Sequence, residues 1–233
     1  STGDPNYNNG GPKTYTLTVG EDKIELSSKN LGSADVALVA TWLQRPEVSA
    51  AVEAVAIGGN PIGSEGGATL LETIKTSKLK TIDIGKPLPL QEQYESDTLD
   101  LSNTQMDPGH VLLLSWLLTT DACAVLTSIN CLANNFGEEV LATVLTAIEG
   151  TSVRSLCGLT EGQTVADFSK QNLKPFDCKV IAAEFGFQGF IAAVARLRVS
   201  GNKITGTEYV GNDIYDHDPD VSGLVSLCEA LLT

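Results

Sequence analysis

Five carboxylates near the C-terminal end of the sequence could together bind a hard cation. They are Glu208, Asp213, Asp216, Asp218 and Asp220. Calcium takes about six to eight oxygen ligands, and acidic residues at alternate positions open the EF-hand loop that binds it. That pattern then fails, because Val221 stands where the loop needs glycine and Leu227 where it needs glutamate. We therefore expect no resident metal. Asp216, Asp218 and Asp220 are the candidate ligands if a cation binds, and a solvated acidic insertion is the alternative.

The two histidines, His110 and His217, are the only ones that a Ser-His-Asp or Cys-His site could use. His110 follows Asp107-Pro108-Gly109 at the start of an expected helix, where an exposed position accounts for it. His217 stands alone in the acidic stretch, without a second nitrogen or sulfur ligand for a transition metal. The sequence therefore names no catalytic residue, and we expect a protein that is not an enzyme and holds no cofactor.

Two further patterns that can carry chemistry also fail. The glycine-rich segment 58–67 resembles a phosphate-binding loop, but no Lys followed by Ser or Thr completes it. Five cysteines are spread along the chain, and no two form the C-x-x-C pair typical of zinc or redox sites. We expect reduced, mostly core-filling thiols, which favours an intracellular, cytoplasmic protein.

A repeat of about thirty residues underlies the whole chain. Six segments carry apolar residues at positions 0, 2 and 7, and the position-7 residues fall at 31, 62, 106, 136, 173 and 204. Position 5 is Asn60, Asn134 and Asn202 in the three clearest copies, and Lys29, Thr104 and Gln171 in the three looser ones. Positions 0 and 2 alternate like a strand, and apolar residues eight and twelve after position 7 form a helical stripe. Each repeat is predicted to be a strand, a turn and a helix.

This repeat resembles that of the leucine-rich repeat family, in its ribonuclease-inhibitor-like subclass, whose units read L-x-x-L-x-L-x-x-N-x-I/L-G before a helix. The resemblance covers roughly residues 24–233 and is clearest over 52–63 and 126–137. It implies an α/β fold of about six repeats: a right-handed curved horseshoe, or solenoid, with a parallel β-sheet on its concave side and α-helices on its convex side. It does not imply ribonuclease inhibition, since a fold alone does not give a function.

Several segments depart from the repeat. We expect residues 1–13 to form a flexible tail and residues 14–233 to form the repeat domain, beginning with a capping strand at about 14–26. Insertions are predicted at about 85–97, 157–164 and 205–220. The first two follow apolar stretches ending at Ile84 and Leu156, so they have one design in common. Such loops often carry partner-specific surface.

The outward-facing strand positions provide most of the candidate partner contacts. They are small and polar, and Arg198 is the only residue among them of a type favoured at interface hot spots. The acidic insertion adds two tyrosines and further carboxylates. The candidate partner-binding residues are Glu25, Asp100, Asn103, Asn130, Asp167, Lys170, Arg198, Glu208, Tyr209, Asp213, Tyr215, Asp216 and Asp218.

Composition excludes some classes of partner. The 233 residues include 29 acidic and 15 basic ones, which gives a formal charge of −14. A surface this acidic repels nucleic-acid phosphates and anionic lipids. Apolar runs stay well short of the about 20 residues that span a bilayer. We expect neither a nucleic-acid partner nor membrane insertion.

These observations favour a non-catalytic protein that binds another protein, whose surface should be basic where it meets residues 208–220. The alternative is a structural or linker subunit of a larger assembly, or a fragment of a longer repeat array. Apolar residues that continue to Leu232 without a polar capping repeat motivate it. A third hypothesis is a calcium-dependent binder or a hydrolase that uses the acidic loop 208–220.

Overall fold

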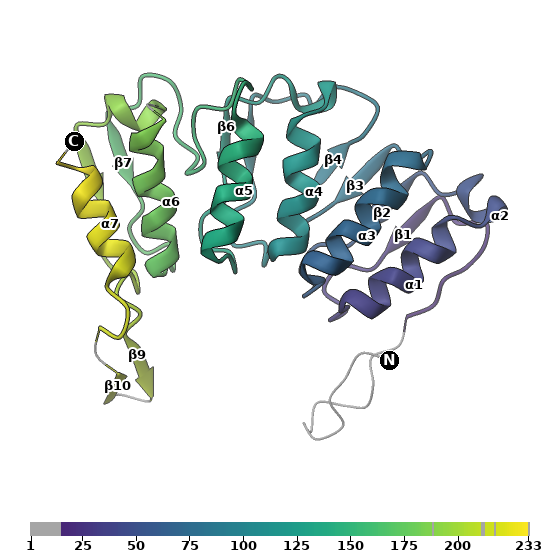
Figure 1. Cartoon of the computed structure of the whole chain (residues 1–233), viewed down its shortest axis with the longest axis horizontal. Helices are drawn as coiled ribbons and strands as arrows, with labels where there is room; N and C mark the ends of the chain where they lie inside the picture. The colour runs from purple at the N-terminus through teal and green to yellow at the C-terminus, as the bar shows by residue number, and fades with distance from the viewer. Residues whose placement is uncertain (1–14, 188, 211–212, 217, 233) are drawn as a thin grey trace. The chain divides into compact units, whose positions relative to one another are not determined.

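The computed structural model describes residues 15–187, 189–210, 213–216 and 218–232, and within these ranges the chain forms seven α-helices and ten short strands (Figure 1). It divides into two compact units. The first unit comprises residues up to 95, 104–125 and 134–151, and the second comprises 96–103, 126–133 and the chain from 152 onward.

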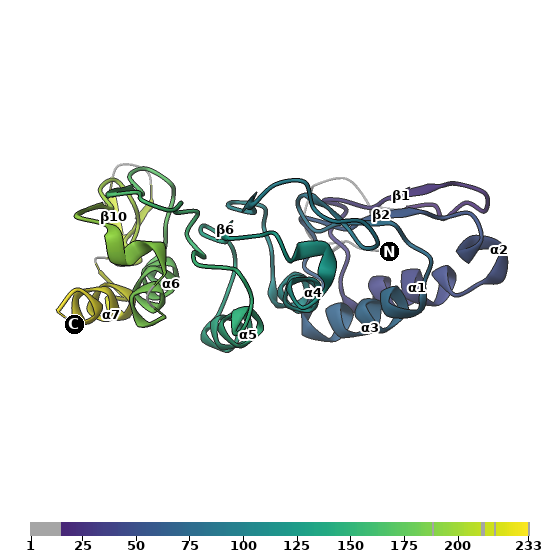
Figure 2. The same ribbon diagram turned by 90° about the horizontal axis from the view of Figure 1, so that it is seen from above.

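The first unit contains a four-stranded sheet with helices packed against it. Figure 2 shows α1 and α3 in a layer on one side of β1 and β2. Its elements are β1 (Lys23–Glu25), α1 (Ser33–Leu43), α2 (Pro46–Ser49), β2 (Ala54–Ala56), α3 (Gly63–Thr76), β3 (Thr81–Asp83), β4 (Pro87–Pro89), α4 (Pro108–Leu118), the 3-10 turn η1 (Asp121–Cys123) and α5 (Glu138–Ile148).

The second unit contains three two-stranded sheets and two helices that pack on each other. Its elements are β5 (Thr98–Asp100), β6 (Ser128–Asn130), β7 (Val165–Asp167), α6 (Pro175–Gly186), the 3-10 turn η2 (Phe190–Ala193), β8 (Arg196–Arg198), β9 (Glu208–Val210), β10 (Asp213–Asp216) and α7 (Ser222–Ala230). Strands β5–β6 and β7–β8 are parallel pairs, and β9–β10 is an antiparallel pair within the segment 205–220.

The prediction of a curved solenoid with one parallel sheet is wrong. The described strands form separate small sheets of two to four strands that are not curled, and the fold is a mixed α/β arrangement. Parallel pairing stops twice along the chain, at the segments 85–97 and 157–164. Both were recognised as departures from the repeat, but the prediction carried the sheet across them.

The first interruption has a clear physical cause. After β3 the chain reverses at Gly85, whose φ of +125° is open to glycine and strained for other residues. Strand β4 then pairs antiparallel with β3, with Asp83 opposite Pro87 and Thr81 opposite Pro89. These two prolines have no N–H to offer a further strand, so β4 closes this edge of the sheet. Strand β5 accordingly belongs to another sheet.

A similar reversal ends pairing in the second unit. Ser155 bridges Ser128 of β6 in parallel, but Cys157 bridges Asn130 in the antiparallel sense. The N–H of Gly158, a residue with positive φ, donates to the carbonyl oxygen of Ile129 at 2.9 Å. Only single bridges form here, so the strand pair β5–β6 is not extended to β7.

Register within each parallel pair follows the repeat columns. We number the repeats 1 to 6 by their position-0 residues, which are Ile24, Val55, Leu99, Ile129, Ala166 and Leu197. Their order in the strands pairs repeat 1 with 2, 3 with 4, and 5 with 6. The position-0 residues of the first five repeats are buried, whereas Leu197 is half-buried.

Close helix contacts account for part of the glycine-rich segment. A Cβ placed on Gly67 of α3 would lie 2.5 Å from the Cα atom of Gly109 in α4. Only glycine permits this approach, because a side chain there would overlap backbone atoms. Gly67 therefore serves packing between two helices of the first unit.

The beginning of the described chain covers the start of α1. Residues 15–18 form no strand, although the predicted capping strand spans about 14–26, and the strand in this range is β1. The Tyr15 hydroxyl donates a 3.3 Å hydrogen bond to Asp35 Oδ1 in the first turn of α1. The predicted tail, residues 1–13, lies outside the described residues. None of the described helices combines the length and apolar character that a membrane span requires.

Candidate functional site

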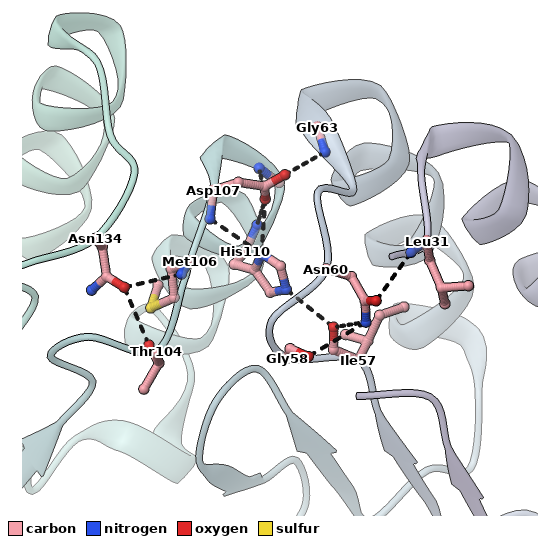
Figure 3. Close-up of polar contacts among 11 residues, drawn as sticks. Leu31, Ile57, Gly58, Asn60, Gly63, Thr104, Met106, Asp107, His110 and Asn134 are labelled. Atoms are coloured by element: carbon pink, nitrogen blue, oxygen red, sulfur yellow. Dashed lines mark hydrogen bonds and ion pairs between the residues drawn. The ribbon is translucent and has the colours of Figure 1, made fainter. Parts of the chain in front are cut away.

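The repeat asparagine is a buried structural residue. Asn60 Oδ1 accepts a hydrogen bond from the N–H of Leu31 at 3.0 Å, and Asn60 Nδ2 donates to the carbonyl oxygen of Ile57 at 2.6 Å (Figure 3). Oδ1 also accepts from the N–H of Lys29 at 2.9 Å, and Nδ2 donates to the carbonyl oxygen of Leu26 at 2.8 Å. Three of these four groups belong to repeat 1, which has Lys29 in place of the asparagine. Asn60 therefore completes the turn of the repeat before its own.

The same four bonds recur in repeats 5 and 6, and one of them recurs in repeats 3 and 4. Asn202 Oδ1 accepts from the N–H groups of Gln171 and Leu173 at 2.9 and 3.1 Å, and its Nδ2 donates to the carbonyl oxygens of Phe168 and Val199. Asn134 Oδ1 accepts from the N–H of Met106 at 3.0 Å (Figure 3). Each asparagine thus serves the preceding repeat that lacks one.

His110 is fully buried, so its predicted exposed position is wrong. Its Nδ1 lies 2.8 Å from Asp107 Oδ1 and its Nε2 lies 3.3 Å from the carbonyl oxygen of Ile57. Asp107 also caps α4, because its Oδ1 accepts from the N–H of Gly109. Its Oδ2 accepts from the N–H of Gly63, the first residue of α3, at 2.6 Å (Figure 3). The pair ties α4 to the strand and turn of repeat 2.

Electrostatics keep the Asp107 carboxylate charged. Burial on its own would raise the pKa of Asp107, but hydrogen bonds from His110 and Gly63 and the charge of His110 outweigh burial, so the net pKa is lowered. Both carboxylate oxygens of Asp107 and both ring nitrogens of His110 have polar partners in the protein, and the ring has no exposed surface. A buried, fully hydrogen-bonded pair of this kind is typical of a structural tie between elements.

A second buried acid lies in the other compact unit. Glu184 of α6 is fully buried, and its Oε1 accepts hydrogen bonds from Ser155 Oγ at 2.8 Å and from the N–H groups of Leu156 and Cys157. Its Oε2 is buried with no hydrogen-bond partner among the described residues. This carboxyl group holds the reversal that ends the β6 pairing.

Burial dominates the acid–base properties of this cluster. It raises the pKa of Glu184, against the opposing effect of the hydrogen bonds from Ser155 and the 156–157 backbone. Burial, together with the nearby Glu184 charge, also raises the pKa of Cys131 to about 12 and that of Cys157 well above its ordinary value. Thiols with raised pKa values are poor nucleophiles at neutral pH, which fits the predicted core-filling role.

The predicted strand-end contacts have a local structural role. Each accepts a hydrogen bond from the N–H two residues ahead: Glu25 from Ser27, Asp100 from Ser102, Asn130 from Leu132 and Asp167 from Ser169. Such a bond stabilises the turn that leaves each strand. The next turn residues are left-handed, with φ of +53° at Asn103 and +58° at Lys170. The acidic types at the strand ends are therefore accounted for without a partner.

Among these predicted residues, Asp167 and Arg198 are brought together. Arg198 Nη1 lies 3.1 Å from Asp167 Oδ2, whereas Lys170 lies across from Gly201 in the adjacent turn. The hydrogen bond from Ser169 and then the Arg198 ion pair lower the pKa of Asp167. Glu25 forms a separate exposed ion pair with Lys23 at 2.9 Å, in the other compact unit.

The candidates of the acidic insertion are placed only in part. The side chains of Glu208, Tyr209, Asp213, Tyr215 and Asp216 lie outside what the structure describes. Asp218 Oδ1 accepts a 3.0 Å hydrogen bond from Thr207 Oγ1, and Asp220 Oδ1 accepts one from the N–H of Ser222. Among the described residues, no three His, Cys, Asp or Glu side chains are placed to hold a metal ion.

An acidic surface surrounds Tyr94 in the predicted insertion 85–97, and none of its residues is among the candidate partner contacts. The N–H of Tyr94 donates to the carbonyl oxygen of Ala122 at 2.8 Å, which fixes the segment 91–95 against η1. Glu92, Glu95 and Asp121 are exposed beside the half-buried ring. From 87 to 153 the chain has nine acidic residues and neither Lys nor Arg, a signal that a running count of charge would have revealed.

The candidate contacts Lys170 and Arg198 belong to a basic surface in the second compact unit, whose charge the sequence prediction did not recognise. Residues 152–204 contain seven basic and four acidic residues, and two of the acids, Asp177 and Glu184, are buried. The chain's strong net negative charge conceals this locally positive charge.

Comparison with models of known protein families and with curated proteins found no match, so the resemblance to the leucine-rich repeat family stays a prediction.

Proposed function

We propose that this protein binds another protein without catalysing a reaction, and that the partner presents a basic surface to the acidic surface around Tyr94. The observation that supports this most directly is the exposure of Glu92, Glu95 and Asp121 in a stretch that has no cation of its own. The segment 91–95 belongs to a predicted insertion, and insertions outside a repeat often carry recognition.

Tyr94 adds an aromatic side chain, of a type favoured at interface hot spots, to the exposed carboxylates around it. Tyr94 is half-buried, and burial, followed by the nearby Cys123, raises the pKa of its hydroxyl. The ring therefore stays neutral at physiological pH and presents an apolar body with one polar tip. Tyrosine is enriched at interface hot spots, while surrounding charges accelerate encounter more than they hold the complex.

The test uses a fluorescein-labelled octalysine peptide as a basic probe of this surface. We expect the double substitution Glu92→Gln and Glu95→Gln to weaken binding about fivefold, because two of three carboxylates are neutralised. The matched control is Glu21→Gln with Glu65→Gln, which removes the same charge from exposed sites elsewhere in the first unit. Fluorescence anisotropy at low and moderate salt measures the dissociation constant.

Hydrogen exchange locates the contact. Protection confined to 91–95 and 121–124 supports the proposal. Equal weakening by both double substitutions would show attraction to net charge alone and would contradict it.

A second candidate function, a subunit of a larger assembly, is supported by the apolar surface of α7. Val225 of α7 is 49% exposed, and the residues that flank the helix, Val221 and Leu232, are 45% and 88% exposed. Surfaces of this kind usually mark an interaction site.

Light scattering coupled to size exclusion tests the assembly candidate. Salt-resistant oligomers that the substitution Val225→Ser dissociates are expected if α7 is a permanent interface. A monomer of about 24.5 kDa at every concentration would argue against self-assembly through α7.

A further inference from the structure

Among the described residues, the outer edge of β8 has no hydrogen-bonded neighbour, whereas the equivalent edge of β6 is bonded to the segment 155–157. In repeat 4, the N–H groups of Ile129 and Cys131 donate to the carbonyl oxygens of Ser155 and Leu156, both at 2.9 Å. The equivalent residues of repeat 6 are Leu197 and Val199. No described strand pairs with that side of β8, which is bonded to β7 alone. The edge therefore presents backbone groups in the geometry that the same fold uses to bind an extended segment.

The side-chain surface along this edge is partly uncovered as well. Leu197 and Val199 are half-buried, whereas their counterparts Ile129 and Cys131 are 0% and 3% exposed. Apolar side chains from an added strand would cover them on the side that faces the core. Because side chains alternate across a strand, every second side chain of the added strand would lie beside the outward-facing side chains of β8.

Those outward-facing residues are basic. Arg196 and Arg198 flank Leu197 and are both exposed. Lys170 and Lys203 are exposed in the two adjacent turns, which are joined by the hydrogen bond from the Gln171 N–H to Asn202 Oδ1 at 2.9 Å. Asp167 is the one acid in β7 and β8, and it is already paired with Arg198. Arg196 has no ion-pair partner among the described residues.

We infer that the open edge of β8 binds an extended acidic segment of another protein, which adds as a strand and alternates acidic with apolar residues. Its carboxylates face Arg196 and Arg198, its apolar residues cover Leu197 and Val199, and its backbone pairs with the two free N–H positions. Charge complementarity selects this occupant, since the exposed cations along β8 and its turns form a basic surface on a chain whose formal charge is −14. The surface is distinct from the acidic surface around Tyr94 and is independent of the proposed function.

The experiment measures binding of a fluorescein-labelled, acetylated peptide, made of four consecutive Val-Glu units, to the full chain by fluorescence anisotropy. We expect binding that the double substitution Arg196→Glu and Arg198→Glu weakens at least tenfold. The control is Lys78→Glu with Lys86→Glu, which changes the net charge equally at exposed sites of the first unit and should leave binding unchanged. Circular dichroism confirms that both variants remain folded.

Backbone pairing is tested with two N-methylated versions of the peptide. In an extended strand the N–H groups of Val and of Glu point to opposite edges, so methylation of one set should abolish binding and methylation of the other should spare it. Retention of binding by both peptides overturns strand addition. Equal binding of a peptide of the same composition, with all its valines first and all its glutamates last, overturns it as well.

Other occupants give different results, each of which overturns the inference. Equal affinity for single-stranded oligothymidine identifies a general polyanion surface. Self-association that Arg196→Glu and Arg198→Glu abolish identifies a second copy as the occupant. Binding that appears only after the carboxylates of 208–220 are neutralised identifies the chain's own insertion. Absence of binding at millimolar peptide also overturns it.

Discussion

Replacing Asn60 by alanine is expected to lower the free energy of unfolding by about 3 to 5 kcal/mol, the largest effect of any single polar substitution in the first unit. The side chain bonds the N–H groups of Lys29 and Leu31 and the carbonyl oxygens of Leu26 and Ile57, and it is 1% exposed. Without it, the Leu31 N–H and the Leu26 carbonyl oxygen lose this buried partner, the other two groups lose one hydrogen bond each, and each buried loss costs about 1 to 3 kcal/mol.

Asn202 offers a matched control, because it makes the same four bonds in a half-buried place. Asn202→Ala should lower the free energy of unfolding by only about 1 to 2 kcal/mol, since water can replace part of the lost bonding. Urea denaturation followed by circular dichroism measures both. Equal effects would show that burial of the turn does not set the cost, and the proposed role of Asn60 would fail.

Replacing Glu184 by alanine should cost about 3 to 4 kcal/mol. The carboxyl group accepts three hydrogen bonds at one oxygen, from Ser155 Oγ and the N–H groups of Leu156 and Cys157. Its loss leaves those donors buried and opens a cavity beneath them. Glu184→Gln keeps an acceptor oxygen at the same place and should cost about 1 kcal/mol. Urea denaturation at pH 7 distinguishes the two variants.

The same residue makes stability depend on pH. Burial raises the pKa of Glu184 in the folded state above its ordinary value of 4.5, so the folded state holds this proton more tightly than the unfolded state does. The resulting stabilisation is complete below about pH 4.5 and is lost as pH rises through the folded-state pKa. Glu184→Gln cannot titrate.

The difference in stability between wild type and Glu184→Gln should therefore shift against the wild type as pH rises from 4 to 8. Comparing the two proteins cancels the contributions of other acids, such as Asp107, whose pKa moves in the opposite direction. A difference that stays constant over this range would show that Glu184 keeps its ordinary pKa in the folded protein.

The local repeat was accessible from sequence because it rests on periodicity. Apolar alternation located the strand centres, and the columns at Ile24 and Val55 pair in register. Continuity of the sheet was not accessible, because it depends on where the chain reverses. The reversal at Gly85 places Pro87 and Pro89 on the edge, and nothing in the repeat pattern predicts that antiparallel pairing.

The candidate site was harder to predict because the same residue type can either contact a partner or stabilise a local turn. A carboxylate at a strand end looks like a partner contact in sequence, but Asp100 and Asp167 cap their own turns. His110 looked exposed because it begins a helix, yet it is buried between α4 and the carbonyl oxygen of Ile57. Local charge can be counted from sequence: the insertion 85–97 was predicted without its acids as candidate contacts, and Arg198 was predicted as a contact without the basic character of 196–203.

The shared asparagine has a consequence for how such a chain can change in length. Repeats 1, 3 and 5 depend on Asn60, Asn134 and Asn202 of the repeat that follows them. Deleting repeat 2 alone would make repeats 1 and 3 neighbours. Both lack the asparagine, with Lys29 and Thr104 at that position, so the turn of repeat 1 would lose its hydrogen-bond partner. Gain or loss in steps of two repeats keeps every turn supplied, so the unit that can be copied or deleted is a pair of repeats, about seventy residues long.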